Sequence, residues 1–112
     1  MKVENKKTII YDIDGTLLYS VPIPCDKCNR NNYEIKEVDQ EEIDLLNKAY
    51  DNGHTIILYT GRGWDLFNYT IKQLNEAGIK FHTLVCGKPV GNFYIDKDSY
   101  KSLKDVLKIS NI

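Results

Sequence analysis

Two carboxylates, Asp12 and Asp14, stand one residue apart at the end of the apolar run 8–13, and Gly15 follows them. Side chains alternate between the two faces of a β-strand, so residues i and i+2 lie on the same side. We therefore expect both acids to lie together where the strand stops, with Gly15 giving the backbone freedom for a sharp exit. Because neighbouring carboxylates repel each other unless a cation or a shared proton intervenes, a divalent metal is the simplest explanation of the pair.

Three more residues with useful chemistry are placed in the same way along the chain. Thr60 and Asp96 each end an apolar run, and Lys88 lies in the loop after another. In open α/β sheets, ligands bind outside the carboxyl ends of the strands. These three residues and the two acids are therefore expected to meet at one edge of a sheet.

The chemistry of this set suits phosphoryl transfer, which needs an in-line nucleophile, neutralised phosphate oxygens and a placed proton. Carboxylates are hard ligands for Mg²⁺, and a carboxylate nucleophile gives a covalent intermediate. The hydroxyl of Thr60 and the backbone amide of Gly61 can hold phosphate oxygens, and Lys88 supplies a positive charge to them. Arg62 is a candidate for phosphate contact or, equally, a cover for the loop. Trp64 follows this loop and is a candidate for substrate contact.

Strands and helices are expected to alternate along the chain. Strands are predicted over 8–13, 54–60, 81–85 and 92–96, and helices over 39–52, 64–76 and 99–108. The run 8–13 is nearly all apolar, which predicts a central strand buried on both faces. The first helix begins with a capping-box pattern, Asp39 followed by Glu42. Alternation of this kind implies parallel βαβ units and an α/β fold.

Residues 17–37 interrupt the alternation. The segments 17–19 and 33–36 could be short strands of a hairpin, because turn-forming residues, including Pro22 and Pro24, separate them. We expect this hairpin to form a flap over the end of the first strand.

Length and charge limit the function classes. The chain has 112 residues, which suits a single domain over 1–112, and a net charge of −1. That charge provides no overall field to attract nucleic acid or an anionic membrane. No apolar stretch approaches the roughly 20 residues of a membrane helix, and no targeting segment is evident, so we expect a cytoplasmic protein.

The run Asp-Ile-Asp-Gly-Thr-Leu, beginning at Asp12, resembles the first motif of the haloacid dehalogenase (HAD) superfamily, whose members are mostly phosphatases. The later order Thr60, Lys88, Asp96 is similar to the other three motifs. The resemblance implies a Rossmann-like three-layer α/β sandwich with a central parallel sheet in the order 3-2-1-4, counting strands along the chain. The insertions are too short for a cap domain, as in small capless members associated with polysaccharide and sugar-phosphate metabolism. Capless members often act on large substrates or use a partner subunit, or an oligomer, to close the site.

The resemblance also implies a role for each residue. Asp12 would be the nucleophile that forms an aspartyl phosphate, and Asp14 would protonate the leaving oxygen and then activate water. The carboxylate of Asp12, the backbone carbonyl of Asp14 and Asp96 would hold Mg²⁺. Thr60 would hydrogen-bond the transferring group, and Lys88 would neutralise its charge. The predicted function is thus a Mg²⁺-dependent phosphomonoester phosphatase acting on a phosphorylated small molecule, such as a sugar phosphate.

Some features depart from this pattern or allow another interpretation. Lys97 stands where the family often has a second acid, and Asp98 could replace that acid or cap the last helix. Cys25 and Cys28 have the spacing of half a zinc site, but a structural site needs four ligands. The other candidate ligands, Cys86, His54 and His82, are dispersed along the chain, which favours incidental thiols of the flap over a zinc site.

Three rival functions remain at this stage. Phosphatase domains of polynucleotide 3′-phosphatases carry similar DxDGT and TGR motifs, although the neutral charge argues against nucleic acid as substrate. Receiver domains also combine acids, Thr and Lys, but in another order along the chain. The third rival is a non-catalytic HAD fold that serves protein contacts. The presence of both Asp12 and Asp14 argues against it.

Overall fold

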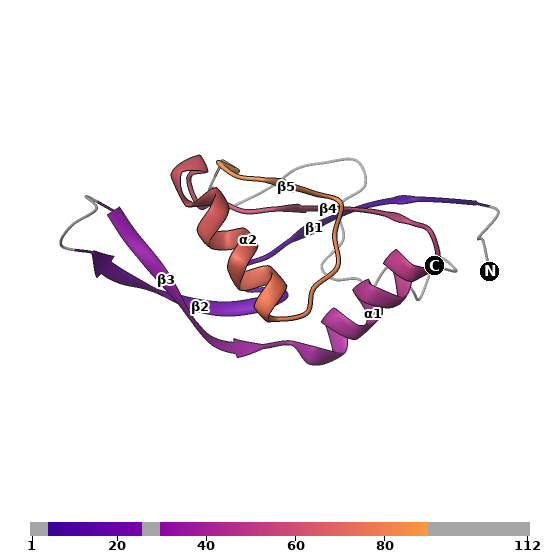
Figure 1. Ribbon diagram of the computed structural model, residues 1–112, viewed down its shortest axis with the longest axis horizontal. Helices are drawn as coiled ribbons and strands as arrows, with labels where there is room; N and C mark the ends of the chain where they lie inside the picture. The colour runs from indigo at the N-terminus through magenta and orange to yellow at the C-terminus, as the bar shows by residue number, and fades with distance from the viewer. Residues whose placement is uncertain (1–4, 26–29, 90–112) are drawn as a thin grey trace.

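The computed structural model describes residues 5–25 and 30–89 (Figure 1). The elements in chain order are β1 (Thr8–Asp12), β2 (Leu18–Cys25), β3 (Arg30–Val38), α1 (Gln40–Asp51), β4 (Thr55–Tyr59), the 3₁₀ helix η1 (Trp64–Leu66), α2 (Phe67–Glu76) and β5 (Thr83–Val85). The strand predicted at 92–96 and the helix predicted at 99–108 lie outside the described residues. No helix in the described part is long and apolar enough to cross a membrane.

β1, β4 and β5 form a parallel sheet in the order β1-β4-β5. β1 pairs with β4 from Thr8 opposite Thr55 to Asp12 opposite Tyr59, and β4 pairs with β5 on its other edge. This confirms the α/β class and the predicted neighbours for these three strands. Each crossover contains a helix, as parallel pairing requires.

The core lies between this sheet and the two helices. Alternate strand residues face it, including Tyr11, Ile56, Leu58 and Leu84, and they meet Ile43 and Leu46 of α1 and Leu74 of α2. The opposite face of the sheet is more open, since Ile10 is 62% exposed. The prediction that the first strand is buried on both faces is therefore wrong for the described residues. Both crossovers run in the same direction across the sheet, so right-handed connections place α1 and α2 on one face.

α1 begins as predicted, because Oδ1 of Asp39 accepts a hydrogen bond from the backbone N–H of Glu42 at 3.1 Å. The reciprocal half of the capping box is absent, since the N–H of Asp39 donates to the carbonyl of Leu17. The Glu42 side chain is buried instead and accepts a hydrogen bond from the hydroxyl of Tyr11. This pair joins the start of α1 to the carboxyl-terminal part of β1.

β2 and β3 form the predicted hairpin, as a separate antiparallel sheet. Figure 1 shows it at the side of the molecule where the parallel strands end. Its strands are longer than expected, because Pro22 and Pro24 lie within β2 instead of in a turn. Both strands of a two-stranded ribbon are edge strands, where proline is tolerated. The structure describes no cap domain in addition to this hairpin.

Candidate active site

The loops after β4 and β5 run side by side at the carboxyl ends of the strands. The N–H of Thr60 donates to the carbonyl of Val85 at 3.0 Å, and the N–H of Lys88 donates to the carbonyl of Thr60 at 2.9 Å. The N–H of Gly87 donates to the carbonyl of Arg62 at 2.8 Å. These bonds hold Thr60, Arg62 and Lys88 at the edge where β1 ends in Asp12. The structure thus brings together all the predicted site residues that it describes.

Asp12 is held between a lysine and a threonine. Its Oδ1 lies 3.6 Å from Nζ of Lys88, and its Oδ2 accepts a hydrogen bond from Oγ1 of Thr16 at 3.4 Å. The Lys88 ammonium also lies 4.4 Å from the centre of the Tyr59 ring, where a cation–π attraction steadies it. The Asp12 side chain remains 34% exposed and the Lys88 side chain 15%. The Asp12 side chain is therefore partly accessible to a ligand.

The surroundings of Asp12 disfavour its charged form. Burial raises the pKa of its carboxyl above the usual value, and the negative charge of Asp14 raises it further. The positive charge of Lys88 opposes both effects without cancelling them. Burial, and not an excess of negative charge, is the main cause, because Lys88 and Arg62 match the two carboxylates in number.

Asp14 lies in the turn after β1, which Gly15 completes with a φ of +83°. Its Oδ2 accepts hydrogen bonds from Oγ1 of Thr60 at 2.8 Å and Nε of Arg62 at 3.2 Å. Its Oδ1 accepts from Nη2 of Arg62 at 2.9 Å and Oγ of Ser20, in β2, at 2.8 Å. The two bonds from Arg62 form a bidentate ion pair. Four donors thus fix the direction of this carboxylate.

Thr60 is fully buried, and both hydrogen-bonding roles of its hydroxyl are used. Besides donating to Asp14, Oγ1 accepts a hydrogen bond from the N–H of Arg62 at 3.1 Å. The described contacts therefore connect Thr60 to Asp14 and Arg62. Its expected contact with phosphate stays a prediction.

Arg62 lies inside the protein, with its side chain only 1% exposed. Besides the pair with Asp14, Nη1 donates to Oγ1 of Thr70 at 3.3 Å and to Oε1 of Gln73 at 2.5 Å, both in α2. The Tyr33 ring of β3 covers the guanidinium at 4.5 Å. Sequence reasoning did not find these partners. The one local signal is Gln73, a polar residue on a helix face that otherwise packs into the core.

Two of the three predicted magnesium ligands, Asp12 and Asp14, lie among the described residues. The described residues contain no group of three or more His, Cys, Asp or Glu placed to hold a metal ion. Two of the expected ligands, Asp12 and Asp14, are in place, whereas Asp96 lies outside the described residues, as do Lys97 and Asp98. The donors present fit Mg²⁺, because Asp12 offers an accessible hard oxygen beside a second carboxylate. The Asp14 carboxylate is occupied by its four donors, which leaves the backbone carbonyl as the ligand that residue can contribute.

The predicted zinc half-site cannot be examined, because Cys28 and the side chain of Cys25 lie outside the described part of the chain. The remaining cysteine, Cys86, is a buried free thiol between β5 and Gly87.

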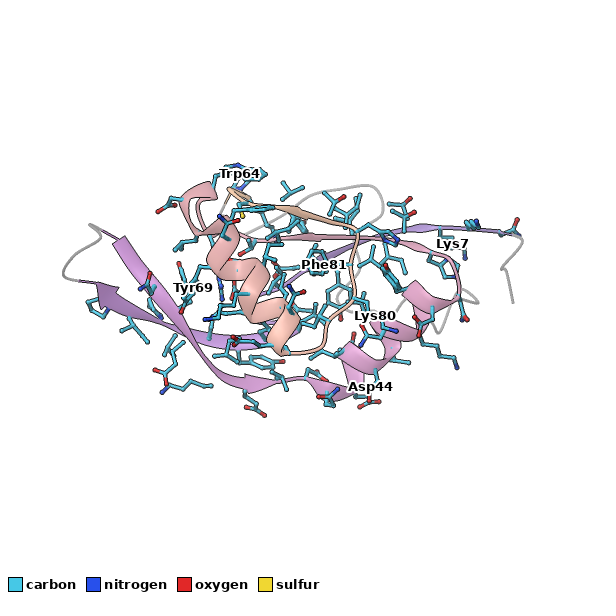
Figure 2. All side chains as sticks on the ribbon, in the orientation of Figure 1. Lys7, Asp44, Trp64, Tyr69, Lys80 and Phe81 are labelled. Atoms are coloured by element: carbon cyan, nitrogen blue, oxygen red, sulfur yellow. The ribbon has the colours of Figure 1, made fainter. Side chains whose placement is uncertain are left out.

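Trp64 is 59% exposed and stacks on Phe67, with 5.9 Å between ring centres. Figure 2 shows Trp64 beside the end of β5, at the upper edge of the view.

Residues 9–112 match the family model for haloacid dehalogenase-like hydrolases. The match begins in β1 and includes every residue of the candidate site. A search of curated proteins and a search of solved structures each found no significant match.

Proposed function

This chain belongs to the haloacid dehalogenase-like hydrolase family, and we propose that it is a Mg²⁺-dependent phosphatase that hydrolyses phosphomonoesters through an aspartyl phosphate on Asp12. The observation that carries the proposal is the placement of Asp12 at the carboxyl end of β1. One side of this carboxylate faces the Lys88 ammonium, and Asp14 lies in the turn that follows.

In the first step, an oxygen of Asp12 attacks the phosphorus of the ester, and the bond from phosphorus to the leaving oxygen breaks. Asp14, in its protonated form, gives a proton to that oxygen, so the leaving group departs as a neutral alcohol. The hydrogen bond that Asp14 accepts from Thr60 opens in this step to make room for the leaving oxygen. Lys88 lies close enough to Asp12 to stabilise the negative charge on the transferring phosphoryl group. The backbone N–H of Gly61 is the proposed partner of one phosphate oxygen. The Thr60 hydroxyl would join it by exchanging its hydrogen bond to Asp14 for one to the transferring group.

In the second step, Asp14 accepts a proton from water as the water oxygen attacks phosphorus. The bond from phosphorus to Asp12 breaks, which releases inorganic phosphate and restores the carboxylate. Asp12 and the backbone carbonyl of Asp14, with Asp96, are the proposed ligands of the metal. Mg²⁺, when bound, neutralises phosphate charge and holds a phosphate oxygen near the nucleophile.

The proposed substrate is a small phosphorylated molecule, and a sugar phosphate is the first candidate on the basis of the resemblance to small capless members. The β2–β3 hairpin lies at the side of the molecule where the parallel strands end (Figure 1), and Trp64 is exposed near the end of β5 (Figure 2). We propose that the substrate enters from this side. An oligomer or a partner subunit that covers this open side is part of the proposal.

Phosphate release from a substrate panel tests the proposal. The panel contains sugar phosphates, nucleotides, a 3′-phosphorylated oligonucleotide and p-nitrophenyl phosphate, with Mg²⁺ or with a chelator. We expect release that needs Mg²⁺ and is abolished in Asp12→Asn, with the preferred substrate naming the class. Preference for the oligonucleotide would identify the substrate as the phosphorylated end of a polynucleotide instead of a sugar phosphate. Binding of Mg²⁺ without release of phosphate from any substrate would contradict the proposal that this chain is a phosphatase on its own.

A further inference from the structure

We propose that Arg62 is a positioning residue, which holds Asp14 in place for proton transfer and connects it to the β2–β3 hairpin, and that it is not a phosphate ligand. This inference rests on the proposed function for the role of Asp14. The connection itself is a property of the fold and can be tested without turnover.

The donors of Arg62 are fully used inside the protein. A guanidinium has five N–H groups in a rigid plane and no acceptor. Five side-chain oxygens lie within hydrogen-bonding distance of them, namely Oδ1 and Oδ2 of Asp14, Oγ of Ser20, Oγ1 of Thr70 and Oε1 of Gln73. With the Tyr33 ring over its face, the guanidinium has no N–H group left for a phosphate oxygen.

Burial makes this arrangement costly to break. A buried charge that loses its partner is strongly destabilising, because its desolvation is no longer compensated. Arg62 and Asp14 are each other's charged partner, and the guanidinium fork matches both carboxylate oxygens. Lysine cannot reproduce this geometry, because it offers a single charged point. The direction of the Asp14 carboxylate therefore depends on where Arg62 is held.

Arg62 is held in turn by α2 and the hairpin. Gln73 accepts from Arg62 through Oε1 and donates through Nε2 to the carbonyl of Tyr33 at 2.7 Å. The hydroxyl of Tyr69 donates to the same carbonyl at 2.5 Å. Figure 2 shows Tyr69 between α2 and the hairpin. Gln73 is thus a bridge between the Arg62 side chain and the backbone of β3.

Both hairpin strands reach the acid. β3 does so through Tyr33, Gln73 and Arg62, and β2 does so directly through Ser20, whose hydroxyl donates to Asp14. A shift of the hairpin therefore requires hydrogen bonds of Arg62 or Asp14 to break. The position of the β2–β3 hairpin and the orientation of the Asp14 carboxylate are therefore coupled.

Two substrates with different leaving groups separate this role from phosphate binding. An alkyl phosphate needs a proton on its leaving oxygen, whereas p-nitrophenolate leaves without one. The comparison uses kcat/KM, which reports the steps up to departure of the leaving group and excludes the later hydrolysis common to both substrates. In Arg62→Lys and in Gln73→Leu, we expect kcat/KM for an alkyl phosphate to fall by roughly tenfold or more relative to p-nitrophenyl phosphate. The matched control is Asn68→Leu, the same kind of change at an exposed position of α2. Equal losses of kcat/KM on both substrates would show a phosphate ligand and overturn the proposal.

A melting experiment tests the connection independently of activity. Asp14 and Gln73 both bind Arg62, and no contact between them is seen in the described structure, so their effects should be coupled only through Arg62. We expect the loss of melting temperature in Asp14→Asn with Gln73→Leu to be smaller than the sum of the two single losses. Additive losses would overturn the proposal. If wild type releases no phosphate from any substrate, the proposed function fails and this experiment still decides whether the connection exists.

Discussion

The ammonium of Lys88 lies 3.6 Å from Oδ1 of Asp12, which ends the first strand of the parallel sheet. These residues are far apart in the chain. The N–H of Lys88 donates to the carbonyl of Thr60, and this hydrogen bond holds the loop that carries Lys88 at the carboxyl ends of the strands, where Asp12 lies. The pair is partly shielded from water, so its attraction is screened less than that of a surface ion pair. This relationship places a cation beside the proposed nucleophile.

Replacement of Lys88 by Met should lower kcat by about 10²- to 10³-fold, because it removes a fixed charge from the developing phosphoryl group. Steady-state phosphate release measures the loss. Lys80→Met is the control, since Lys80 forms an exposed ion pair with Asp51. Equal rates in Lys88→Met and wild type would remove Lys88 from the mechanism.

The stability of the metal-free protein should depend on the charge of Asp12. Its pKa is raised in the folded state, so the folded protein holds the proton more tightly than the unfolded chain. The contribution of Asp12 is therefore fully present below the usual carboxyl pKa and is lost as the pH rises through the raised value. In Asp12→Asn, urea unfolding should show a weaker loss of stability over this window. Mg²⁺ should raise the melting temperature of wild type and not of the variant.

Gly87 is a position where an added methyl group should disturb the site. Its φ of +77° disfavours other residues, and a Cβ there would lie 3.3 Å from Nε1 of Trp64. Gly87→Ala should cost about 1–2 kcal/mol of unfolding free energy. It should also change the fluorescence of Trp64, which is the single tryptophan of the chain.

Gly78→Ala is the matched control for Gly87→Ala. Gly78 has a φ of +74°, but nothing lies within 4 Å of its added Cβ. We expect a similar loss of stability and an unchanged fluorescence spectrum. A spectral change in both variants would show that the effect does not come from contact with Trp64.

Cys86 should react slowly with thiol reagents. Burial raises the pKa of its thiol, and the charge of Arg62 opposes this effect only in part. Since the thiolate is the reactive form, its low population and its burial should both protect it. The combined substitution Cys25→Ser and Cys28→Ser leaves Cys86 as the one thiol, whose alkylation can be followed by mass spectrometry. Labelling in the native state as fast as in urea would contradict the buried position.

The sequence is informative where a pattern is local. The apolar run before Asp12, the cap at Asp39 and the helical spacing of α1 depend on neighbours within a few residues, and each is confirmed. Likewise, parallel βαβ units bring strand ends to one edge, so Asp12, Thr60 and Lys88 could be expected to meet.

The missed features depend on contacts between distant segments. The partners of Arg62 come from α2 and from the hairpin, so no spacing along the chain announces them. Pro22 and Pro24 are typical turn residues, and they favour a turn when only the sequence is considered. In the structure they lie in β2, which is an edge strand and tolerates proline, and the sequence does not show which strands are edges. Among the described elements, the handedness of two crossovers places both helices on the face of the sheet opposite Ile10, which an apolar run does not reveal.

The covalent intermediate offers the most direct test of the central claim. The protein is mixed with Mg²⁺ and its best substrate, quenched with borohydride, which reduces an aspartyl phosphate to homoserine, and digested for mass spectrometry. We expect the reduced residue at position 12 and nowhere else, and no such product in Asp12→Asn. Phosphate release by wild type without modification at position 12, together with an active Asp12→Asn variant, would contradict the assignment of Asp12 as the nucleophile.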